Sequence, residues 1–189
     1  MADTQFLKQK ILPFSLSAVI LLADQLSKAF IVKNWPQIGT LICDVFGNDL
    51  LLIYHVRNKV IAFSLGGGVP ESLRPLLFVA LPVAVLIFLC VYYFKDTQCT
   101  ALQRWAIAGI TGGGAGNLID RVFRPDGVVD FISVKFFGIF GFERWPTFNV
   151  SDSAVVVCVI IWFISMITQE AGAIKRNSGA KPDVKHTQG

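Results

Sequence analysis

Two acidic residues, Asp130 and Asp152, have the type and the surroundings needed for acid–base chemistry. Asp130 lies inside the apolar stretch 128–132, and Asp152 immediately precedes the uncharged run 153–169. A carboxylate at the edge of a bilayer is costly unless it is paired or used. Burial would raise the pKa of Asp130, whereas the first turn of a helix would favour the ionised form of Asp152. Two acids in such different surroundings suit a proton donor and a proton acceptor.

Other polar residues have both structural and chemical interpretations. Asp152 taken alone is explained by an ordinary helix cap, and the sequence separation of the two acids does not place them in contact. Asp120 precedes Arg121, so Asp120 is either a local charge partner or a catalytic group. Asn117 and Arg121 share a helical face near a predicted membrane boundary. There they would bind a backbone carbonyl or a lipid head group, or tie helices together.

Asp24 and Lys28 have i,i+4 spacing and would therefore lie on one face of a helix. Pairing would cancel most of the cost of burying either charge. We interpret the two residues as a structural ion pair, because the other predicted helices offer no matching chain of intramembrane carboxylates. The alternative is a proton or ion pathway, which would make the protein a small transporter or channel subunit.

Glycine is concentrated in one predicted helix, residues 103–120. Gly109 with Gly113, and Gly112 with Gly116, have the spacing that lets two helices approach closely in a membrane. Helix packing explains this pattern without any ligand. We therefore expect the glycines to serve close packing of this helix.

The composition is that of a membrane protein. Of 189 residues, 53% are hydrophobic and 16% are charged, with a mean hydropathy of +0.59; a soluble domain carries about 25% charged residues. The net charge of +4 comes from dispersed basic residues, which argues against nucleic-acid binding. The four cysteines form no CxxC pair and two histidines cannot build a metal site, so we expect neither a metal nor a disulfide framework.

Four segments are predicted to cross the bilayer as helices. They are residues 11–32, 75–94, 103–120 and 152–169. Lys8 and Lys10 precede the first segment as in a secretory signal, but no cleavage site follows it, so we expect an uncleaved helix. Basic residues are shared evenly between the two sides, so the positive-inside rule does not orient the chain. Residues 1–174 are predicted to form one membrane domain, followed by a polar cytoplasmic tail, residues 175–189.

The two longer connections are predicted to lie outside the membrane. Residues 38–66 have the pattern of a small β-sheet, because β-forming residues 41–46 and 50–56 flank a turn signal at residues 47–49. Residues 121–149 are predicted to be an extracytoplasmic loop. Aromatic residues alternate with glycine in this loop, which is typical of an interfacial belt or of a flap that covers a site.

The polar motifs together resemble those of lipoprotein signal peptidases, also called signal peptidase II or prolipoprotein signal peptidase, a family of aspartic peptidases. Five motifs carry the resemblance, in order over nearly the whole chain: Asp24-Gln25-Leu26-Ser27-Lys28, Asn58 with Ala62-Phe63-Ser64, Gly113-x-x-Gly116-Asn117-Leu118-Ile119-Asp120-Arg121, Val129-Asp130-Phe131 and Phe148-Asn149-x-x-Asp152. Each motif is weak alone, whereas five in this order are highly specific.

The resemblance implies a membrane α-helical fold with four transmembrane helices, cytoplasmic termini, a small extracytoplasmic sheet called the β-cradle, and an interfacial loop or mobile periplasmic helix. It implies a multi-pass protein of the bacterial cytoplasmic (inner) membrane. The implied activity removes the signal peptide from a prolipoprotein by cutting just before the diacylglyceryl-modified cysteine. The partners are such prolipoproteins and membrane lipid. We expect a monomer that needs no cofactor and binds no nucleic acid.

The resemblance also assigns roles to residues. Asp130 and Asp152 are expected to be the catalytic pair, whereas Asp120 belongs to a motif without being catalytic. Supporting or substrate-binding roles are expected for Asp24, Lys28, Asn58, Gly109, Gly113, Asn117, Arg121 and Asn149.

The chain departs from the family pattern at two places. Val60 and Ile61 stand where the family usually has Gly-Ala, so the local turn or its approach to substrate would differ. Ser151 stands where the family usually has alanine, and its hydroxyl would cap the last helix or bind a catalytic carboxylate. Neither change removes a carboxylate, so we expect activity to survive.

Overall fold

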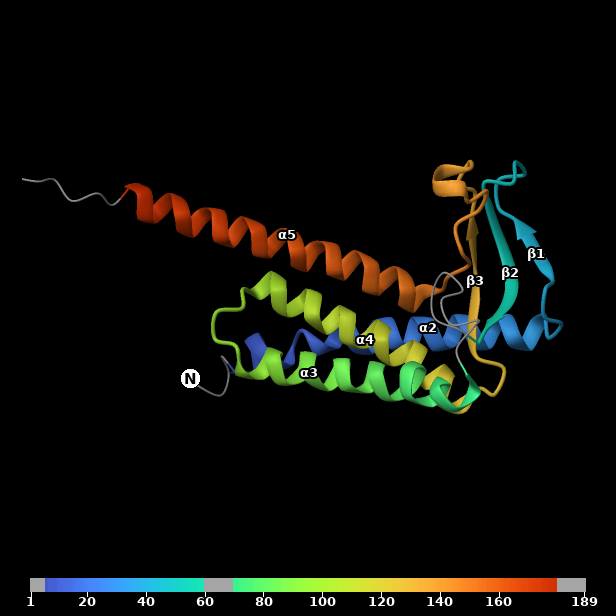
Figure 1. Cartoon of the computed structure of the whole chain (residues 1–189), viewed down its shortest axis with the longest axis horizontal. Coiled ribbons are helices and arrows are strands. Elements are labelled where there is room, and N and C mark those ends of the chain that lie inside the picture. Colours follow the sequence, from blue (N-terminus) through green and yellow to red (C-terminus); the bar gives the residue numbers. More distant parts are fainter. Residues whose placement is uncertain (1–5, 60–69, 180–189) are drawn as a thin grey trace, which may run out of the picture.

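The computed structural model describes residues 6–59 and 70–179. In this part of the chain, a bundle of α-helices is closed at one end by an antiparallel sheet (Figure 1). The α-helices are α2 (Phe14–Asn34), α3 (Leu81–Lys95), α4 (Ala101–Phe123) and α5 (Val150–Gly179). The strands are β1 (Leu41–Asp44), β2 (Leu51–Asn58) and β3 (Val128–Val134). Short helical turns are η1 (Leu7–Ile11), η3 (Glu71–Leu73), η4 (Leu76–Ala80) and η5 (Ile139–Gly141).

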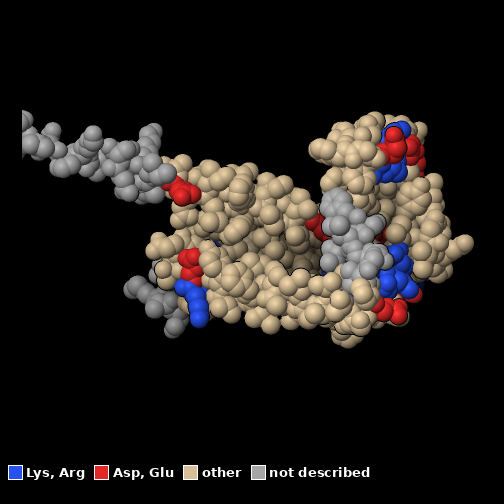
Figure 2. All heavy atoms as spheres, in the orientation of Figure 1, with Lys and Arg blue, Asp and Glu red and all other residues tan. Residues whose placement is uncertain are grey.

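Within the described residues, three helical segments are long and apolar enough to cross a membrane. They are Lys8–Asn34, Glu71–Lys95 and Val150–Gly172. On the face seen in Figure 2, charged side chains gather at the two ends of the molecule and the middle of the helices carries none. The fourth predicted span, α4, does not meet the same standard. It carries Arg104, Asp120 and Arg121, and most of its length is buried by its neighbours.

Proline and capping residues set the helix ends. Pro36 follows the last residues of α2, and Pro125 follows α4; the residue before a proline disfavours helical backbone. At the start of α4, the side chain of Thr100 accepts the backbone N–H of Gln103 at 3.2 Å, and the Gln103 side chain accepts the N–H of Thr100 at 2.9 Å. This reciprocal capping box fixes the first turn of α4.

The sheet has the order β1-β2-β3 and all its pairs are antiparallel. The first two strands and their turn agree with the sequence pattern. The third strand was not predicted, because residues 121–149 were interpreted as a loop. β3 pairs with β2 from Leu51 opposite Val134 to Asn58 opposite Val128, and a register shift separates the two halves. Asp130 thereby lies on β3, at one edge of the sheet, opposite Val56.

All four α-helices end beyond their predicted limits, and the largest extensions are in α4 and α5. α4 runs from Ala101 to Phe123 rather than over residues 103–120. α5 begins at Val150 and continues to Gly179, past residue 169 and into the segment predicted as a polar tail. The predicted ends followed the loss of hydrophobicity, whereas a helix continues as long as its backbone hydrogen bonds do.

The glycines of α4 allow close helix contacts, as the spacing indicated. A Cβ atom on Gly112 would lie 2.6 Å from the Ser17 Cα of α2, and one on Gly113 would lie 2.6 Å from the Ser151 carbonyl oxygen of α5. Both distances are too short for any real side chain, so these positions require glycine. On the same helix, Ala106 and Ile110 form a core with Cys158 of α5.

The aromatic part of the predicted loop follows β3. Phe137 and Phe140 are exposed, at 67% and 87%, and both have positive φ angles. Arg144 holds the base of this loop, because it donates to the Asp49 carboxylate at 2.8 Å and to the Ser133 carbonyl at 2.7 Å. The interpretation of these aromatic residues as an interfacial belt or flap stays a prediction.

One quoted motif and one departure lie outside the described residues. They are Ala62-Phe63-Ser64 and the pair Val60 and Ile61. The last ten positions of the predicted tail, residues 180–189, also lie outside them. The remaining motifs are all within the described part of the chain, and the structure places each of them.

Candidate active site

The pairing of β3 with the segment before α5 brings the two predicted acids together. Phe148 forms an antiparallel bridge with Ile132, and its carbonyl accepts the N–H groups of Phe131 and Ile132 at 3.0 and 2.8 Å. The next residue, Asn149, therefore lies beside Asp130, and α5 begins immediately after it with Asp152 in its first turn. Strand β3 and the first turn of α5 therefore meet at the two acids that were predicted to carry the chemistry.

Asp130 is a buried carboxylate held by two amide donors. Only 2% of the residue is exposed. Asn58 Nδ2 donates to its Oδ2 at 3.0 Å, and Asn149 Nδ2 donates to its Oδ1 at 2.8 Å. Burial, together with the nearby charge of Asp152, raises the pKa of Asp130 from 3.8 to about 7, against the opposing effect of the two amide hydrogen bonds. Asp130 is therefore poised to hold or release a proton near neutral pH.

Asp152 both caps its helix and faces the site. Its Oδ2 accepts the backbone N–H of Asn149 at 3.1 Å, while Asn149 Oδ1 accepts the backbone N–H of Asp152 at 2.9 Å. This is a reciprocal cap, as the structural interpretation expected. The other oxygen, Oδ1, accepts Asn117 Nδ2 at 2.7 Å. Asn149 is fully buried and donates to both carboxylates, so this one residue sets their relative position.

Both carboxylates line a groove with a volume of about 1030 Å³. The polar part of its lining comes from β2, α4, β3 and α5, and it includes Arg57, Asn58, Asn117, Arg121, Asp130 and Asp152. The rest is largely apolar and comes from α3, α4 and α5: Leu81, Val85, Leu89, Ile110 and Val155. The groove thus joins a pair of acids to a hydrophobic channel between helices.

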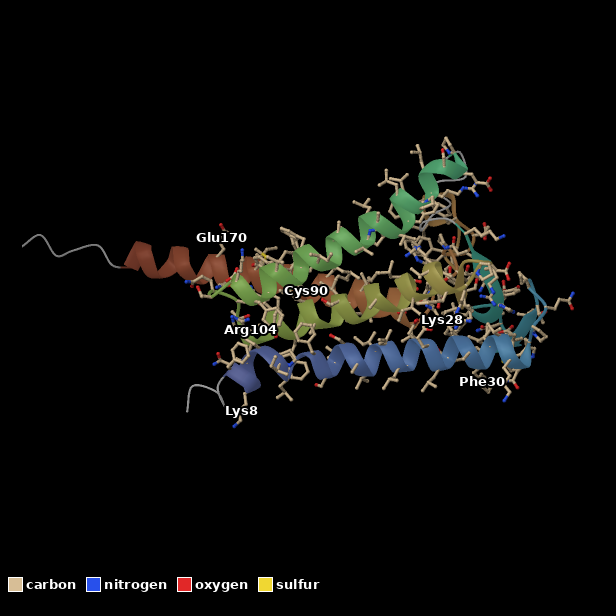
Figure 3. All side chains as sticks on the ribbon, turned by 90° about the horizontal axis from the view of Figure 1, so that it is seen from below. Lys8, Lys28, Phe30, Cys90, Arg104 and Glu170 are labelled. Atoms are coloured by element: carbon tan, nitrogen blue, oxygen red, sulfur yellow. The ribbon has the colours of Figure 1, made fainter. Side chains whose placement is uncertain are left out.

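A buried charge network lies directly behind the site. Lys28 Nζ is 2.8 Å from Asp24 Oδ2 and 3.1 Å from Asp120 Oδ2, and all three side chains are fully buried. The same ammonium donates to Asn117 Oδ1 at 2.9 Å. Figure 3 shows Lys28 at the sheet end of the bundle. The Asp24–Lys28 pair is therefore an internal ion pair, and Asp120 completes it.

The two carboxylates of this network hold the backbone next to the two candidate catalytic acids. Asp24 Oδ1 accepts the N–H of Ser151 at 3.0 Å, one residue before Asp152. Asp120 Oδ2 accepts the N–H of Val129 at 3.1 Å, one residue before Asp130. Lys28 lies between the two carboxylates. The charge network therefore anchors β3 and the start of α5 to the same pair of helices, α2 and α4.

The structure brings most predicted site residues together, with two exceptions. The two exceptions are Gly109 and Gly113, which lie at contacts of α4 with α5 and do not line the groove.

The predictions for the Ser151 side chain were wrong. It neither caps α5 nor binds a carboxylate, and among the described residues its buried hydroxyl has no hydrogen-bond partner. It faces Gly116, where any added Cβ would collide with it.

The positions and contacts of three residues at the site were not predicted from the sequence. Asp120 was interpreted as a neighbour of Arg121, but its ion pairs are with Lys28 and Arg124. Gln25 donates to Asp24 at 3.1 Å and to Asp120 at 3.2 Å, and its place inside the first quoted motif was the available signal. Arg57 lines the groove on β2 without any local sequence signal. Within the described ranges, no group of three or more His, Cys, Asp or Glu residues is arranged to hold a metal ion.

Known proteins of one kind match this chain over most of its length. The family model described as signal peptidase (SPase) II matches residues 16–168. A lipoprotein signal peptidase of Treponema denticola is 49% identical over 162 residues, which cover 86% of this chain and 92% of that protein. One of Treponema pallidum is 42% identical over 167 residues, covering 88% and 89%.

A solved structure shares the fold as well. It is a bacterial membrane enzyme determined by the in meso method at 2.3 Å resolution, with a TM-score of 0.68 and 28% sequence identity. The match covers 92% of this chain and 94% of that one. The apolar helices are those of a multi-pass membrane protein. From the family match and the two relatives, this chain belongs to the signal peptidase II family of lipoprotein signal peptidases, and it is a peptidase.

Proposed function

We propose that the protein is an aspartic endopeptidase that removes signal peptides from prolipoproteins, cutting on the N-terminal side of the diacylglyceryl-modified cysteine. Asp130 and Asp152 are the proposed catalytic pair. One observation carries the proposal: Asn149 donates to Asp130 Oδ1 at 2.8 Å and to Asp152 Oδ2 at 3.1 Å, which fixes two carboxyl groups on one groove. The raised pKa of Asp130, about 7, supports a shared proton at neutral pH.

In the proposed reaction, the ionised member of the pair takes a proton from a water molecule. The water oxygen attacks the scissile carbonyl carbon, and the protonated member donates to the developing oxyanion. Collapse of the tetrahedral intermediate breaks the carbon–nitrogen bond, and the nitrogen leaves with a proton from the pair. We assign the initial proton to Asp130, because its pKa is raised to about 7, whereas Asp152 lies in the first turn of α5, where the helix dipole favours a carboxylate.

The shape of the groove supports a helical substrate. Its apolar walls on α3 and α5 would receive the signal helix, while the two acyl chains of the modified cysteine remain in lipid. Asn58, Asn117 and Arg121 lie beside the acids and would hold substrate carbonyl groups. Asp24 and Lys28 would support the site from behind. One chain supplies both acids, so a monomer suffices.

We further propose the placement of the protein in the membrane. All four α-helices would cross the bacterial inner membrane, with α4 shielded from lipid by α2, α3 and α5. The sheet and the acid pair would lie on the extracytoplasmic side, and both termini in the cytoplasm. The transporter alternative is set aside, because the family is one of peptidases and the Asp24–Lys28 pair is closed by Asp120 without exposure to solvent.

The proposal is tested by amide substitution of each acid. Asp130→Asn and Asp152→Asn should each lower the cleavage of a diacylglyceryl-modified prolipoprotein by roughly 10³-fold or more, since each removes one half of the acid–base pair. Asp126→Asn, which changes an exposed carboxylate on the turn before β3, should leave cleavage near the wild-type rate.

Folding of each variant is checked by its elution from a sizing column in detergent. Cleavage at the wild-type rate by folded Asp130→Asn or Asp152→Asn would remove that residue from the mechanism. Cleavage of an unmodified prolipoprotein as fast as the lipid-modified one would remove the proposed substrate specificity while leaving the acid pair intact.

A further inference from the structure

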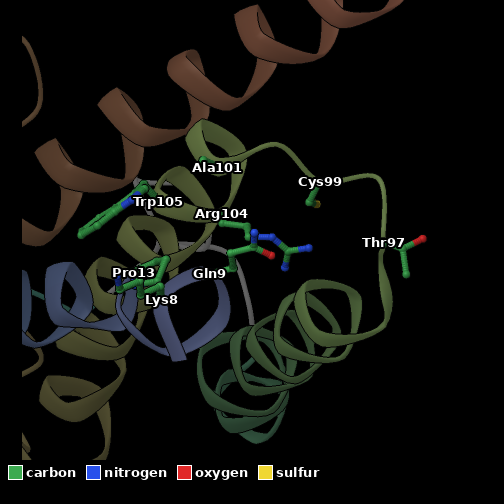
Figure 4. A pocket seen from close by; sticks show the side chains of 8 residues that line it. All are labelled: Lys8, Gln9, Pro13, Thr97, Cys99, Ala101, Arg104 and Trp105. Atoms are coloured by element: carbon green, nitrogen blue, oxygen red, sulfur yellow. The ribbon is translucent and has the colours of Figure 1, made fainter. Parts of the chain in front are cut away.

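A second cavity lies at the end of the bundle opposite the acid pair. Its volume is about 210 Å³, and it is enclosed by η1, the connection between α3 and α4, and the first turn of α4 (Figure 4). Its lining consists of Lys8, Gln9, Pro13, Thr97, Cys99, Ala101, Arg104 and Trp105. Figure 3 shows Lys8 and Arg104 at this end and Lys28 at the other. The catalytic proposal uses none of these residues.

Arg104 is the buried cation of this cavity. Only 6% of the residue is exposed. Its Nη1 and Nη2 donate to the carbonyl oxygens of Tyr93 and Asp96, each at 3.1 Å, and its guanidinium lies 5.4 Å from the centre of the Tyr93 ring. Within the described residues, no carboxylate forms an ion pair with it. Neutral carbonyls orient a guanidinium but do not cancel its charge, and a buried charge is costly until an anion cancels it.

The remaining features around this cavity are also suited to an anion. Lys8 lines it, and no acidic residue does. The nearest turn contains Asp96, whose carboxylate accepts the N–H groups of Gln98 and Cys99 at 2.5 and 3.1 Å. Besides the Tyr92 side chain, the charge of Arg104 contributes to lowering the pKa of Asp96, but among the described residues Asp96 and Arg104 form no ion pair. Ala101 in the lining begins α4, and the positive end of a helix dipole favours a bound anion.

The surroundings indicate which anion is available there. Trp105 is 37% exposed, and Leu12 and Leu102 nearby are more than half exposed. A tryptophan between apolar side chains and cationic groups is typical of the level of lipid head groups. The cavity has the volume of several water molecules, at about 30 Å³ each, which suffices for a phosphate group.

We propose that this cavity binds the phosphate group of an anionic lipid through Arg104 and Lys8. The lipid would lock η1 against the connection between α3 and α4, far from the acid pair. A free phosphate ion presents the same oxygen atoms, so the experiment must distinguish the two sources.

The test uses the full-length protein in detergent and native mass spectrometry. Wild type should retain phosphatidylglycerol in preference to phosphatidylcholine. Lys8→Gln should weaken this retention by about fivefold, the effect expected for one cation near a lipid surface, and Arg104→Gln should weaken it further. Lys33→Gln, which removes an exposed cation in the last turn of α2, is the matched control and should retain the lipid as wild type does.

Each other outcome counts against the proposal. Equal retention of both lipids, or unchanged preference in Lys8→Gln and Arg104→Gln, would overturn it. If Arg104→Gln fails to fold, Lys8→Gln alone decides, because the Lys8 side chain is exposed and has no part in the bundle core. Binding of inorganic phosphate with the same sensitivity to the variants, without retained lipid, would assign the cavity to a free ion and overturn the lipid source.

Discussion

The two ends of the bundle bury their cations in opposite ways. At the sheet end, Lys28 lies between two carboxylates, Asp24 at 2.8 Å and Asp120 at 3.1 Å. At the other end, Arg104 donates to two carbonyl oxygens and lies over the Tyr93 ring, and among the described residues no carboxylate forms an ion pair with it. The first cation is neutralised by carboxylates in contact, whereas the second is oriented mainly by neutral groups. An internally closed network suits a scaffold, whereas an open one suits a ligand site.

The largest effect expected from this comparison is on stability. Lys28→Met leaves two buried carboxylates without their shared cation and should lower the free energy of unfolding by about 3–5 kcal/mol. Arg104→Met leaves two neutral carbonyls without donors and should cost only about 1–3 kcal/mol. Unfolding by a denaturing detergent, followed by circular dichroism, measures both. Equal losses would mean that the two cations are held in the same way after all.

Close packing at the sheet end gives the next effect. A Cβ on Gly116 would lie 2.6 Å from Asp24 Oδ2, so Gly116→Ala should push the charge network apart and cost about 1–3 kcal/mol. It should also lower peptidase activity, because Asp24 holds the backbone at Ser151. Gly172→Ala on α5, where an added Cβ meets nothing within 4 Å, is the matched control. A loss in Gly172→Ala as large as that in Gly116→Ala would contradict this explanation.

Asp130 is a carboxylate at the sheet end that forms no ion pair with any of the described residues. Because its pKa is raised from 3.8 to about 7, its protonated form stabilises the fold; this contribution is complete below about pH 4 and is lost as the pH rises through about 7. Asp130→Asn cannot titrate. Its apparent Tm relative to wild type should therefore rise by roughly 5 °C between about pH 5 and about pH 8.

The matched control for this pH effect is Asp126→Asn, whose carboxylate is exposed. Its apparent Tm relative to wild type should stay constant over the same pH range. The assignment of the pKa shift to Asp130 would be wrong if the two variants showed the same dependence on pH.

The smallest effect concerns Ser151. Its hydroxyl is buried without a partner in the described part of the chain, so Ser151→Ala should change stability by less than about 1 kcal/mol, in the stabilising direction, and should keep the activity. Ser17→Ala is the contrasting variant, because the Ser17 hydroxyl donates to the Ala108 carbonyl at 2.6 Å. It should cost about 0.5–1.5 kcal/mol. A clear loss in Ser151→Ala would reveal a contact of that hydroxyl in the working enzyme.

Local spacing was enough to predict the parts of the site that depend on a single helix. Asp24 and Lys28 lie on one face because their spacing matches a helical turn, and the glycines of α4 face other helices because small residues permit close contact. The first two strands followed from β-forming residues on either side of a turn. These predictions hold because each depends on neighbours within one element.

Local sequence patterns could not predict contacts between segments that are distant in the chain. β3 was missed because residues 121–149 were interpreted as one loop, although the turn signal Pro125-Asp126-Gly127 precedes the strand. Its partner strand β2 is far away in the sequence, so no local pattern showed the pairing. For Asp120 the sequence offered a local charge partner of Arg121 or a catalytic group, whereas its ion pairs are with Lys28, on another helix, and Arg124. Asn149 can donate to both Asp130 and Asp152 because the bridge between Ile132 and Phe148 places it beside β3. The resemblance gave the residues of the site, and the sheet supplies their geometry.

The burial of α4 has a consequence for how the protein is made. If α4 crosses the bilayer as we propose, it leaves the ribosome before α5, so Gly109 and Gly113 must face lipid or the insertion machinery until α5 arrives to cover them. Its charged residues make it a poor membrane segment by itself. During insertion, α2 would supply the cation for one of these charges, because Lys28 pairs with Asp120, and a chain shortened before α5 would leave the α5 face of α4 uncovered.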